Sequence, residues 1–176
     1  QGVGDQISTF PDYPAEIRAP QGTLSGVSGF QVHIGKGVHT PGDEADVLVA
    51  MNPAALKRHA CFLKKGGVAI VDIDSFKESD LKKALYTTND PYKEIKLDAQ
   101  VVEVPISSMV KSALEGSGLD LKSMLRCKNM FALGLVCWLF DRPLDSALHL
   151  LQNKFAKKPA IFEANAKVMR AGYDYG

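Results

Sequence analysis

The sequence predicts an α/β fold in three layers: a Rossmann-like, mostly parallel sheet with helices on both faces, followed by a helical C-terminal part. Two observations carry this prediction. Two apolar stretches of strand length, residues 45–51 and 68–73, flank a short helical pattern, and such a βαβ unit implies parallel strands joined by a right-handed crossover. From residue 121 onward, helical patterns follow one another along the chain.

The N-terminal region is predicted to hold two strands joined by a long, shaped loop. Residues 7–10 form a short apolar run, and residues 29–34 alternate so that Phe30, Val32 and Ile34 share one face. The stretch between them contains three prolines and is then rich in glycine, serine and threonine. Proline fixes φ and glycine permits positive φ, so this composition is more typical of a defined backbone than of a linker. Such loops often carry binding groups, but a surface crossover that only rounds a corner fits the composition equally well.

Capping signals support the βαβ unit. The strand expected over residues 45–51 is almost entirely apolar, as in a strand covered on both faces. Asn52 is a favoured N-cap residue, and Pro53 suits the first helical position. A helix is expected over residues 54–64. The Lys-Lys-Gly-Gly run at 64–67 is predicted to end it, with cations near the helix C-terminus and glycine as the cap.

The second half of the chain is predicted to be mainly helical. Gly134 lies in the middle of an apolar helix, which is therefore expected to be buried and to pack closely against another backbone. Residues 172–176 are expected to enter a linker. In chain order, the expected elements are a charge-rich helix over 75–86, a loop over 87–97, a strand over 100–106, a helix capped by Ser107 and Ser108 that ends near 114, the apolar helix over 121–140, and helices over 144–156 and 159–171.

The bulk composition argues against several classes of function. The chain of 176 residues is the size of one domain, and 45% hydrophobic and 23% charged residues are ordinary for a soluble globular protein. The net charge of +1 gives no reason to expect nucleic acid or an anionic membrane as partner, and no signal-peptide pattern or membrane-spanning run is recognisable. Three cysteines, far apart and without a Cys-x-x-Cys pair, predict buried thiols in a reducing cytoplasm rather than a disulfide, zinc or iron–sulfur site.

Familiar catalytic motifs fail at identifiable positions. The glycine-containing turn at residues 35–40 lacks the third glycine of the dinucleotide fingerprint and is followed by Pro-Gly instead of a helix. Residues 29–36 miss the spacing of a phosphate loop, and Phe30 stands where a nucleophile elbow needs glycine. The four histidines share no metal-ligand spacing. These failures favour a binding or covering domain over a complete enzyme.

The predicted parallel sheet itself indicates one place where a ligand could bind. In an open parallel sheet, ligands bind beyond the carboxyl ends of the strands. Residues 51–53 are predicted to be such an end, and backbone N–H groups at the helix start that follows are expected to accept an anion. An ordinary strand-to-helix junction is the alternative interpretation.

Several motifs in a fixed order resemble one enzyme family. Residues 46–56 followed by 63–72 are similar to the core of the γ subunit, or γ-like domain, of 2-oxoacid:ferredoxin oxidoreductases. The segment from Ser8 to Arg18, with Gly22 and Thr23, matches the family's Pro-x-x-x-x-Glu-x-Arg-x-x-x-Gly-Thr pattern, with one position fewer or more depending on the subfamily. Further motifs fall in the family's order along nearly the whole chain: Val104-Pro105, Lys128-Asn129-Met130 with Ala132-Leu133-Gly134, and Ala171-Gly172-Tyr173.

The resemblance implies an activity and a place within a larger protein. Enzymes of this family decarboxylate a 2-oxoacid on thiamine diphosphate, pass electrons through [4Fe-4S] clusters to ferredoxin and release an acyl-CoA. Residues 7–24 are most similar to proteins in which the γ-like domain is fused to the N-terminus of the α subunit, often 2-oxoglutarate oxidoreductases. Residues 1–176 are thus expected to be a single γ-like domain from a longer fused α subunit, with 172–176 as the junction. Only residues 1–4 correspond to the family's usual first strand, glycine turn and helix.

The resemblance also implies how the work is divided. This domain is expected to bind no cofactor and to be inactive alone, whereas thiamine diphosphate, Mg and the [4Fe-4S] clusters lie in other domains or subunits of the complex. Those α and β parts are the implied partners, with ferredoxin as an indirect one. The domain would help to close the active site or shape access for coenzyme A and substrate. A self-contained nucleotide-binding α/β module and a non-catalytic assembly adaptor are the alternatives.

Five residues are candidates for the site under this resemblance, and none is assigned to catalysis or to a metal. Arg18 is expected to be a fixed cation for a carboxylate or phosphate and Thr23 a hydroxyl partner, with Glu16 in the same access loop. Asn52 and Asn129 are expected at nearby helix starts. For the four residues other than Glu16, stapling of a loop or capping of a helix is the structural alternative.

Overall fold

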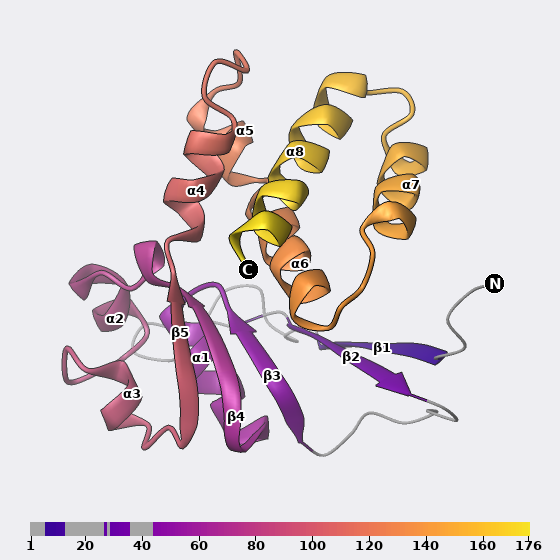
Figure 1. Cartoon of the computed structure of the whole chain (residues 1–176). Coiled ribbons are helices and arrows are strands. Elements are labelled where there is room, and N and C mark those ends of the chain that lie inside the picture. The colour runs from indigo at the N-terminus through magenta and orange to yellow at the C-terminus, as the bar shows by residue number, and fades with distance from the viewer. Residues whose placement is uncertain (1–5, 13–26, 28, 36–43) are drawn as a thin grey trace. The chain divides into compact units, whose positions relative to one another are not determined.

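The computed structural model describes residues 6–12, 27, 29–35 and 44–176 (Figure 1). The chain divides into two compact units, residues 1–104 and residues 105–176, and each is described by itself. The mixed α/β class with a parallel sheet and a helical C-terminal part is confirmed. The assignment of residues 1–176 to one γ-like domain stays a prediction.

The first unit begins with an antiparallel pair of strands, β1 (Gln6–Asp12) and β2 (Gly29–Gly35). Their register runs from the pair Gln6 and Gly35 to the pair Asp12 and Gly29. Both strands were expected from the sequence. The long loop that joins them lies mostly outside the described residues, so its predicted shape stays a prediction.

The parallel sheet of the first unit contains β3 (Ala45–Ala50), β4 (Leu63–Asp72) and β5 (Ala99–Val104), in that spatial order. Both neighbouring pairs are parallel, which confirms the βαβ prediction. The chain moves from β3 to β4 and then to β5, always to the next strand in the same direction. Right-handed crossovers in such an order place both connecting segments on the same face of the sheet, so these segments should pack into one core. They do: Ala50, Leu56, Val71, Phe76, Leu81, Ala84 and Tyr86 form one buried cluster.

Three short helices supply that cover: α1 (Pro53–His59), α2 (Glu78–Lys83) and α3 (Pro91–Glu94). The helix expected over 75–86 is shorter than predicted, because a 3-10 turn, η2 (Ile73–Ser75), precedes it and Leu85, with φ of +59°, follows its end. The predicted loop over 87–97 was wrong in part, because it contains α3. The signal for α3 was present: the Asp90 side chain accepts a hydrogen bond from the Lys93 amide at 3.0 Å, and Pro91 occupies the first turn.

The predicted end of the first crossover helix was wrong. After α1 the chain makes a 3-10 turn, η1 (Ala60–Phe62), and residues 64–67 already belong to β4. The glycines serve a bulge instead of a helix cap, because the register jumps between the pairs Ala45–Leu63 and Val47–Val68. Gly66 has φ of +71°, and its amide donates to the Asp98 carbonyl at 2.8 Å.

The second unit is helical, with α4 (Ile106–Ala113), α5 (Leu121–Leu125), α6 (Lys128–Leu139), α7 (Asp145–Lys154) and α8 (Pro159–Tyr175). The helix expected over 121–140 is divided into α5 and α6 at Arg126 and Cys127. Ser107 and Ser108 lie inside α4 and do not cap it, since the N-cap position is Pro105. Residues 172–175 continue α8, so the predicted linker over 172–176 was wrong for this stretch.

The packing of α6 against α8 confirms the role predicted for Gly134. A Cβ atom added there would lie 2.0 Å from the Met169 carbonyl oxygen. The relation is reciprocal, because a Cβ atom on Gly172 would lie 2.1 Å from the Phe131 carbonyl oxygen. Two glycines, one on each helix, thus let the two backbones touch.

None of the helices in the described part of the chain is long and apolar enough to cross a membrane. The most apolar of them, α6, has 12 residues. A helix of that length extends about 18 Å, well short of the roughly 30 Å of a bilayer core.

Candidate functional site

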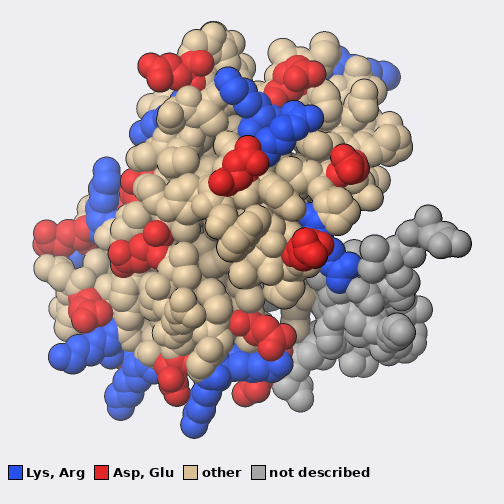
Figure 2. All heavy atoms as spheres, viewed as in Figure 1, with Lys and Arg blue, Asp and Glu red and all other residues tan. Residues whose placement is uncertain are grey.

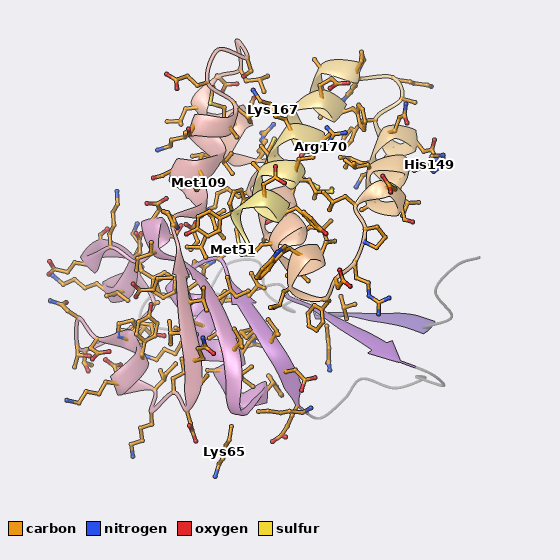
Figure 3. All side chains as sticks on the ribbon, in the orientation of Figure 1. Met51, Lys65, Met109, His149, Lys167 and Arg170 are labelled. Atoms are coloured by element: carbon orange, nitrogen blue, oxygen red, sulfur yellow. The ribbon has the colours of Figure 1, made fainter. Side chains whose placement is uncertain are left out.

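The parallel sheet of the first unit presents its carboxyl edge where β3 and β4 end. Ala50 pairs with Val71, so Met51 and Asp72 come next on neighbouring strands. Figure 3 shows Met51 just beyond the carboxyl end of β3 and Lys65 at the opposite edge of the sheet. Since ligands of open parallel sheets bind at the carboxyl edge, Met51, Asn52 and Asp72 define the candidate site in this unit.

Asn52 lies at the start of α1, where its side chain caps the helix. Its backbone is extended (φ −162°, ψ 165°), and Oδ1 accepts a hydrogen bond from the Ala55 amide at 2.8 Å. The Ala55 amide is therefore engaged within the chain and is not a free anion donor. The expected capping is observed, and a contact from Asn52 to a ligand stays a prediction.

Asp72 was missed by the sequence reasoning. Among the described residues, it is the one charged residue that is fully buried, and it is the last residue of the central strand β4. The Ser75 hydroxyl donates to its Oδ2 at 2.8 Å. A buried carboxylate needs such partners, because loss of hydration otherwise destabilises the charged form. The available signal was an acidic residue at the end of an otherwise apolar strand.

The remaining expected residues lie elsewhere. Asn129 belongs to the second unit, as the second residue of α6, and its side chain is exposed. Glu16, Arg18 and Thr23 lie outside the described residues. The roles proposed for these four residues stay predictions.

Glu94 of α3 organises the segment that follows α2. Its Oε2 accepts hydrogen bonds from the Thr87 and Thr88 amides, at 2.8 and 2.9 Å, and from both threonine hydroxyls, at 3.1 and 3.2 Å. Its Oε1 lies 3.4 Å from Lys57 Nζ. Burial acts to raise the pKa of Glu94, but these donors together outweigh it and lower the pKa to about 2.

The charged groups on the face of the first unit seen in Figure 2 carry both signs. Over the first unit, Figure 2 shows Lys and Arg side chains alternating with Asp and Glu. Several of them are paired, among them Lys64 with Asp46 at 2.6 Å and Lys82 with Glu78 at 2.6 Å. This face therefore has no electrostatic character that would select a polyanion.

Side chains that bind metals do not cluster among the described residues. Within the part of the chain that the structure describes, no group of three or more His, Cys, Asp or Glu side chains could hold a metal ion. The whole sequence has three cysteines, whereas a [4Fe-4S] cluster takes four thiolates. Burial raises the pKa of the Cys127 and Cys137 thiols, which keeps them protonated at neutral pH. The residues present do not fit such a cluster.

Comparison with known proteins gives the family. The family model described as "Pyruvate ferredoxin/flavodoxin oxidoreductase" matches residues 2–175. The chain belongs to this family. This pyruvate ferredoxin/flavodoxin oxidoreductase family chain is 46% identical, over 175 residues, to the 2-oxoglutarate oxidoreductase subunit KorA of Mycobacterium tuberculosis (strain ATCC 25618 / H37Rv). That match covers 98% of the chain and 27% of the relative, so the chain spans about a quarter of that protein's length.

Two solved structures share the fold of this oxidoreductase family chain. The γ subunit of a keto/oxoacid ferredoxin oxidoreductase from Geobacter sulfurreducens superposes with a TM-score of 0.60 at 21% identity, over 97% of this chain and 80% of that one. A 2-oxoglutarate:ferredoxin oxidoreductase from Magnetococcus marinus, with 2-oxoglutarate, coenzyme A and succinyl-CoA bound, gives 0.62 at 25% identity, over 98% of this chain and 26% of that one. The predicted family resemblance is confirmed by the family model and the identity to KorA, and the likeness to the γ subunit is one of fold.

Proposed function

We propose that this chain is the γ-like domain of a thiamine-diphosphate-dependent 2-oxoacid:ferredoxin oxidoreductase. The complete complex would convert a 2-oxoacid such as 2-oxoglutarate into its acyl-CoA and pass the electrons to ferredoxin. Thiamine diphosphate supplies the decarboxylation chemistry, and with Mg and the [4Fe-4S] clusters it would belong to other domains or subunits. This domain would act without a catalytic residue of its own, by helping to close the active site or by shaping access for coenzyme A and substrate.

The observation that carries the proposal is the 46% identity to the KorA subunit across 98% of the chain. The alignment covers the segment around Arg18 and the βαβ unit alike, because it leaves out almost none of the chain. The Magnetococcus marinus structure adds the substrate class, since 2-oxoglutarate and coenzyme A are bound to it. These names are the grounds for choosing 2-oxoglutarate over other 2-oxoacids.

Arg18 offers the sharpest test of the access role. The complex assembled with Arg18→Ala is assayed for reduction of ferredoxin with 2-oxoglutarate and coenzyme A. A lost charge-assisted hydrogen bond predicts that KM for one of these ligands rises about tenfold or more, and Arg18→Lys tests whether a point charge suffices. Arg58→Ala is the control, because Arg58 is an exposed arginine on α1. Unchanged KM values for both ligands would remove Arg18 from the site.

The two alternative functions predict different results in the same experiments. A self-contained nucleotide-binding module would show a rise in Tm of this chain with NAD, ATP or coenzyme A, of a size set by ligand concentration over Kd. An assembly adaptor would show Arg18 variants that fail to assemble yet turn over normally once assembled. No turnover of any 2-oxoacid by the wild-type complex would refute the proposed function.

A further inference from the structure

Tyr86 connects the segment after α2 to the first residue of α1. Its buried hydroxyl donates a hydrogen bond to the carbonyl oxygen of Pro53 at 3.2 Å. Pro53 directly follows Asn52, so this bond holds the chain at the point where it leaves the carboxyl edge of the sheet. Burial, with a further contribution from Glu94, raises the pKa of Tyr86 to about 12, so the phenol stays neutral and remains a donor at neutral pH.

Lys57, one turn further along α1, is held from three sides by the same segment. Its ammonium group donates to the Leu85 carbonyl oxygen at 2.5 Å and lies 3.4 Å from Glu94 Oε1. It also lies 4.4 Å from the centre of the Tyr86 ring. The side chains of Lys57 and Glu94 are 28% and 18% exposed, so this pair is shielded from solvent far more than ordinary surface pairs.

Glu94 in turn fixes the segment that carries Tyr86, through its bonds to the amides and hydroxyls of Thr87 and Thr88. Lys57, Tyr86 and Glu94 therefore form one connected network, which we call the α1 clamp. Two of its contacts reach α1 at different turns, at Pro53 and at Lys57, so the clamp constrains both the position and the direction of the helix.

We propose that the α1 clamp is a positioning device for the turn of Met51 and Asn52 at the candidate site. This inference rests on the proposed function, because it takes the carboxyl edge as the ligand edge. Packing alone would not need these polar atoms, since apolar side chains of similar volume usually stabilise a buried contact equally well. What the polar bonds add is a fixed direction for the Pro53 carbonyl and hence for the residues before it.

Tyr86→Phe is the cleanest perturbation, because it keeps the ring beside Lys57 and removes only the bond to Pro53. Tyr92→Phe is a matched control, because the Tyr92 hydroxyl donates to Glu103 of β5 at 2.8 Å and not to a residue of α1. In the assembled complex, Tyr86→Phe is expected to raise KM for 2-oxoglutarate or coenzyme A about three- to tenfold, the range of one hydrogen bond, with kcat nearly unchanged. Tyr92→Phe is expected to leave both KM values at the wild-type level.

A second measurement reports on the turn without turnover. The Ala55 and Leu56 amides bond to the Asn52 side chain and carbonyl, at 2.8 and 3.2 Å. Their hydrogen exchange is expected to be about three- to tenfold faster in Tyr86→Phe than in Tyr92→Phe. Lys57→Met should have the same effect, and Lys57→Arg, which keeps a cation and its donors, should restore most of the protection.

The outcomes separate this proposal from the proposed function. An active complex in which Tyr86→Phe and Tyr92→Phe have equal KM values, or equal exchange at these two amides, would overturn the clamp as a positioning device. A wild-type complex without turnover of a 2-oxoacid would instead refute the proposed function, and the role of the clamp in ligand binding would fall with it. Higher KM and faster exchange in Tyr86→Phe alone would support both.

Discussion

At the contact between α6 and α8, replacing Gly134 by alanine is expected to destabilise the protein, although helix propensity alone predicts stabilisation. In an open helical position, Gly→Ala stabilises by about 1 kcal/mol. At Gly134 the added Cβ atom would lie 2.0 Å from the Met169 carbonyl oxygen and 2.9 Å from the Tyr173 amide nitrogen. Both neighbours are backbone atoms, so no side chain can rotate away, and the two helices must separate by roughly 1 Å.

Separation of the helices loosens the core of the second unit around Phe131 and Met169, which are both buried. Overpacking of this kind costs about 1–3 kcal/mol, and more where backbone must move. Against the gain from propensity, Gly134→Ala is expected to lower the free energy of unfolding by about 2 kcal/mol net. For a chain of this size, that corresponds to a fall in Tm of about 4–8 °C.

Urea unfolding and calorimetry of the isolated chain measure this difference. Asn129→Ala on the same helix is the control, because Asn129 is exposed and its replacement changes propensity without a clash. That control is expected to be neutral or to gain a few tenths of a kcal/mol. If Gly134→Ala proved as stable as the wild type, the close contact of the two backbones would be wrong.

Two further predictions concern the first unit. The pKa of Glu94 is lowered from 4.5 to about 2, so its stabilising contribution is fully present above pH 4.5 and is lost as pH falls toward 2. Glu94→Gln should therefore reduce the fall in Tm between pH 4.5 and pH 2. The same dependence of Tm on pH in Glu94→Gln and in the wild type would contradict the assigned hydrogen bonds. Lys96 has φ of +52° at the end of α3, where an L side chain is strained, so Lys96→Gly is expected to be neutral or to stabilise by up to about 1 kcal/mol in urea unfolding. A clear loss of stability in Lys96→Gly would show that the lysine side chain contributes packing that outweighs the strain.

Local signals in the sequence were sufficient for the βαβ unit. Two apolar runs, with Asn52 and Pro53 between them, specify strand, cap and helix within one short stretch, and the structure contains each of them. Local signals failed where two interpretations shared the same residues. Gly66 and Gly67 suit a helix cap and a bulge equally, and only the partner strand decides between them.

The candidate site was less predictable for a different reason. The α1 clamp joins residue 57 of α1, residue 86 after α2 and residue 94 of α3, so the periodicity of a single helix or strand does not bring them together. Asp72 was visible as an acidic strand end, but its burial depends on tertiary packing. Resemblance to a family selected the access loop around Arg18, which lies outside the described residues, and pattern reasoning alone left that loop's role open.

The bulge at Gly66 and Gly67 determines where the connection from α1 to β4 can gain or lose residues. The register between β3 and β4 starts anew at the pair of Val47 and Val68 and continues unbroken to Ala50 and Val71. Insertions or deletions in residues 63–66 would be absorbed before that point, at the edge marked by Lys65 and far from Met51 (Figure 3). Homologues can therefore differ in the length of this connection while Asn52 and Asp72 keep their alignment. The bulge at Gly66 and Gly67 thus lets the chain change in length at the amino edge of the sheet without moving the residues at its carboxyl edge.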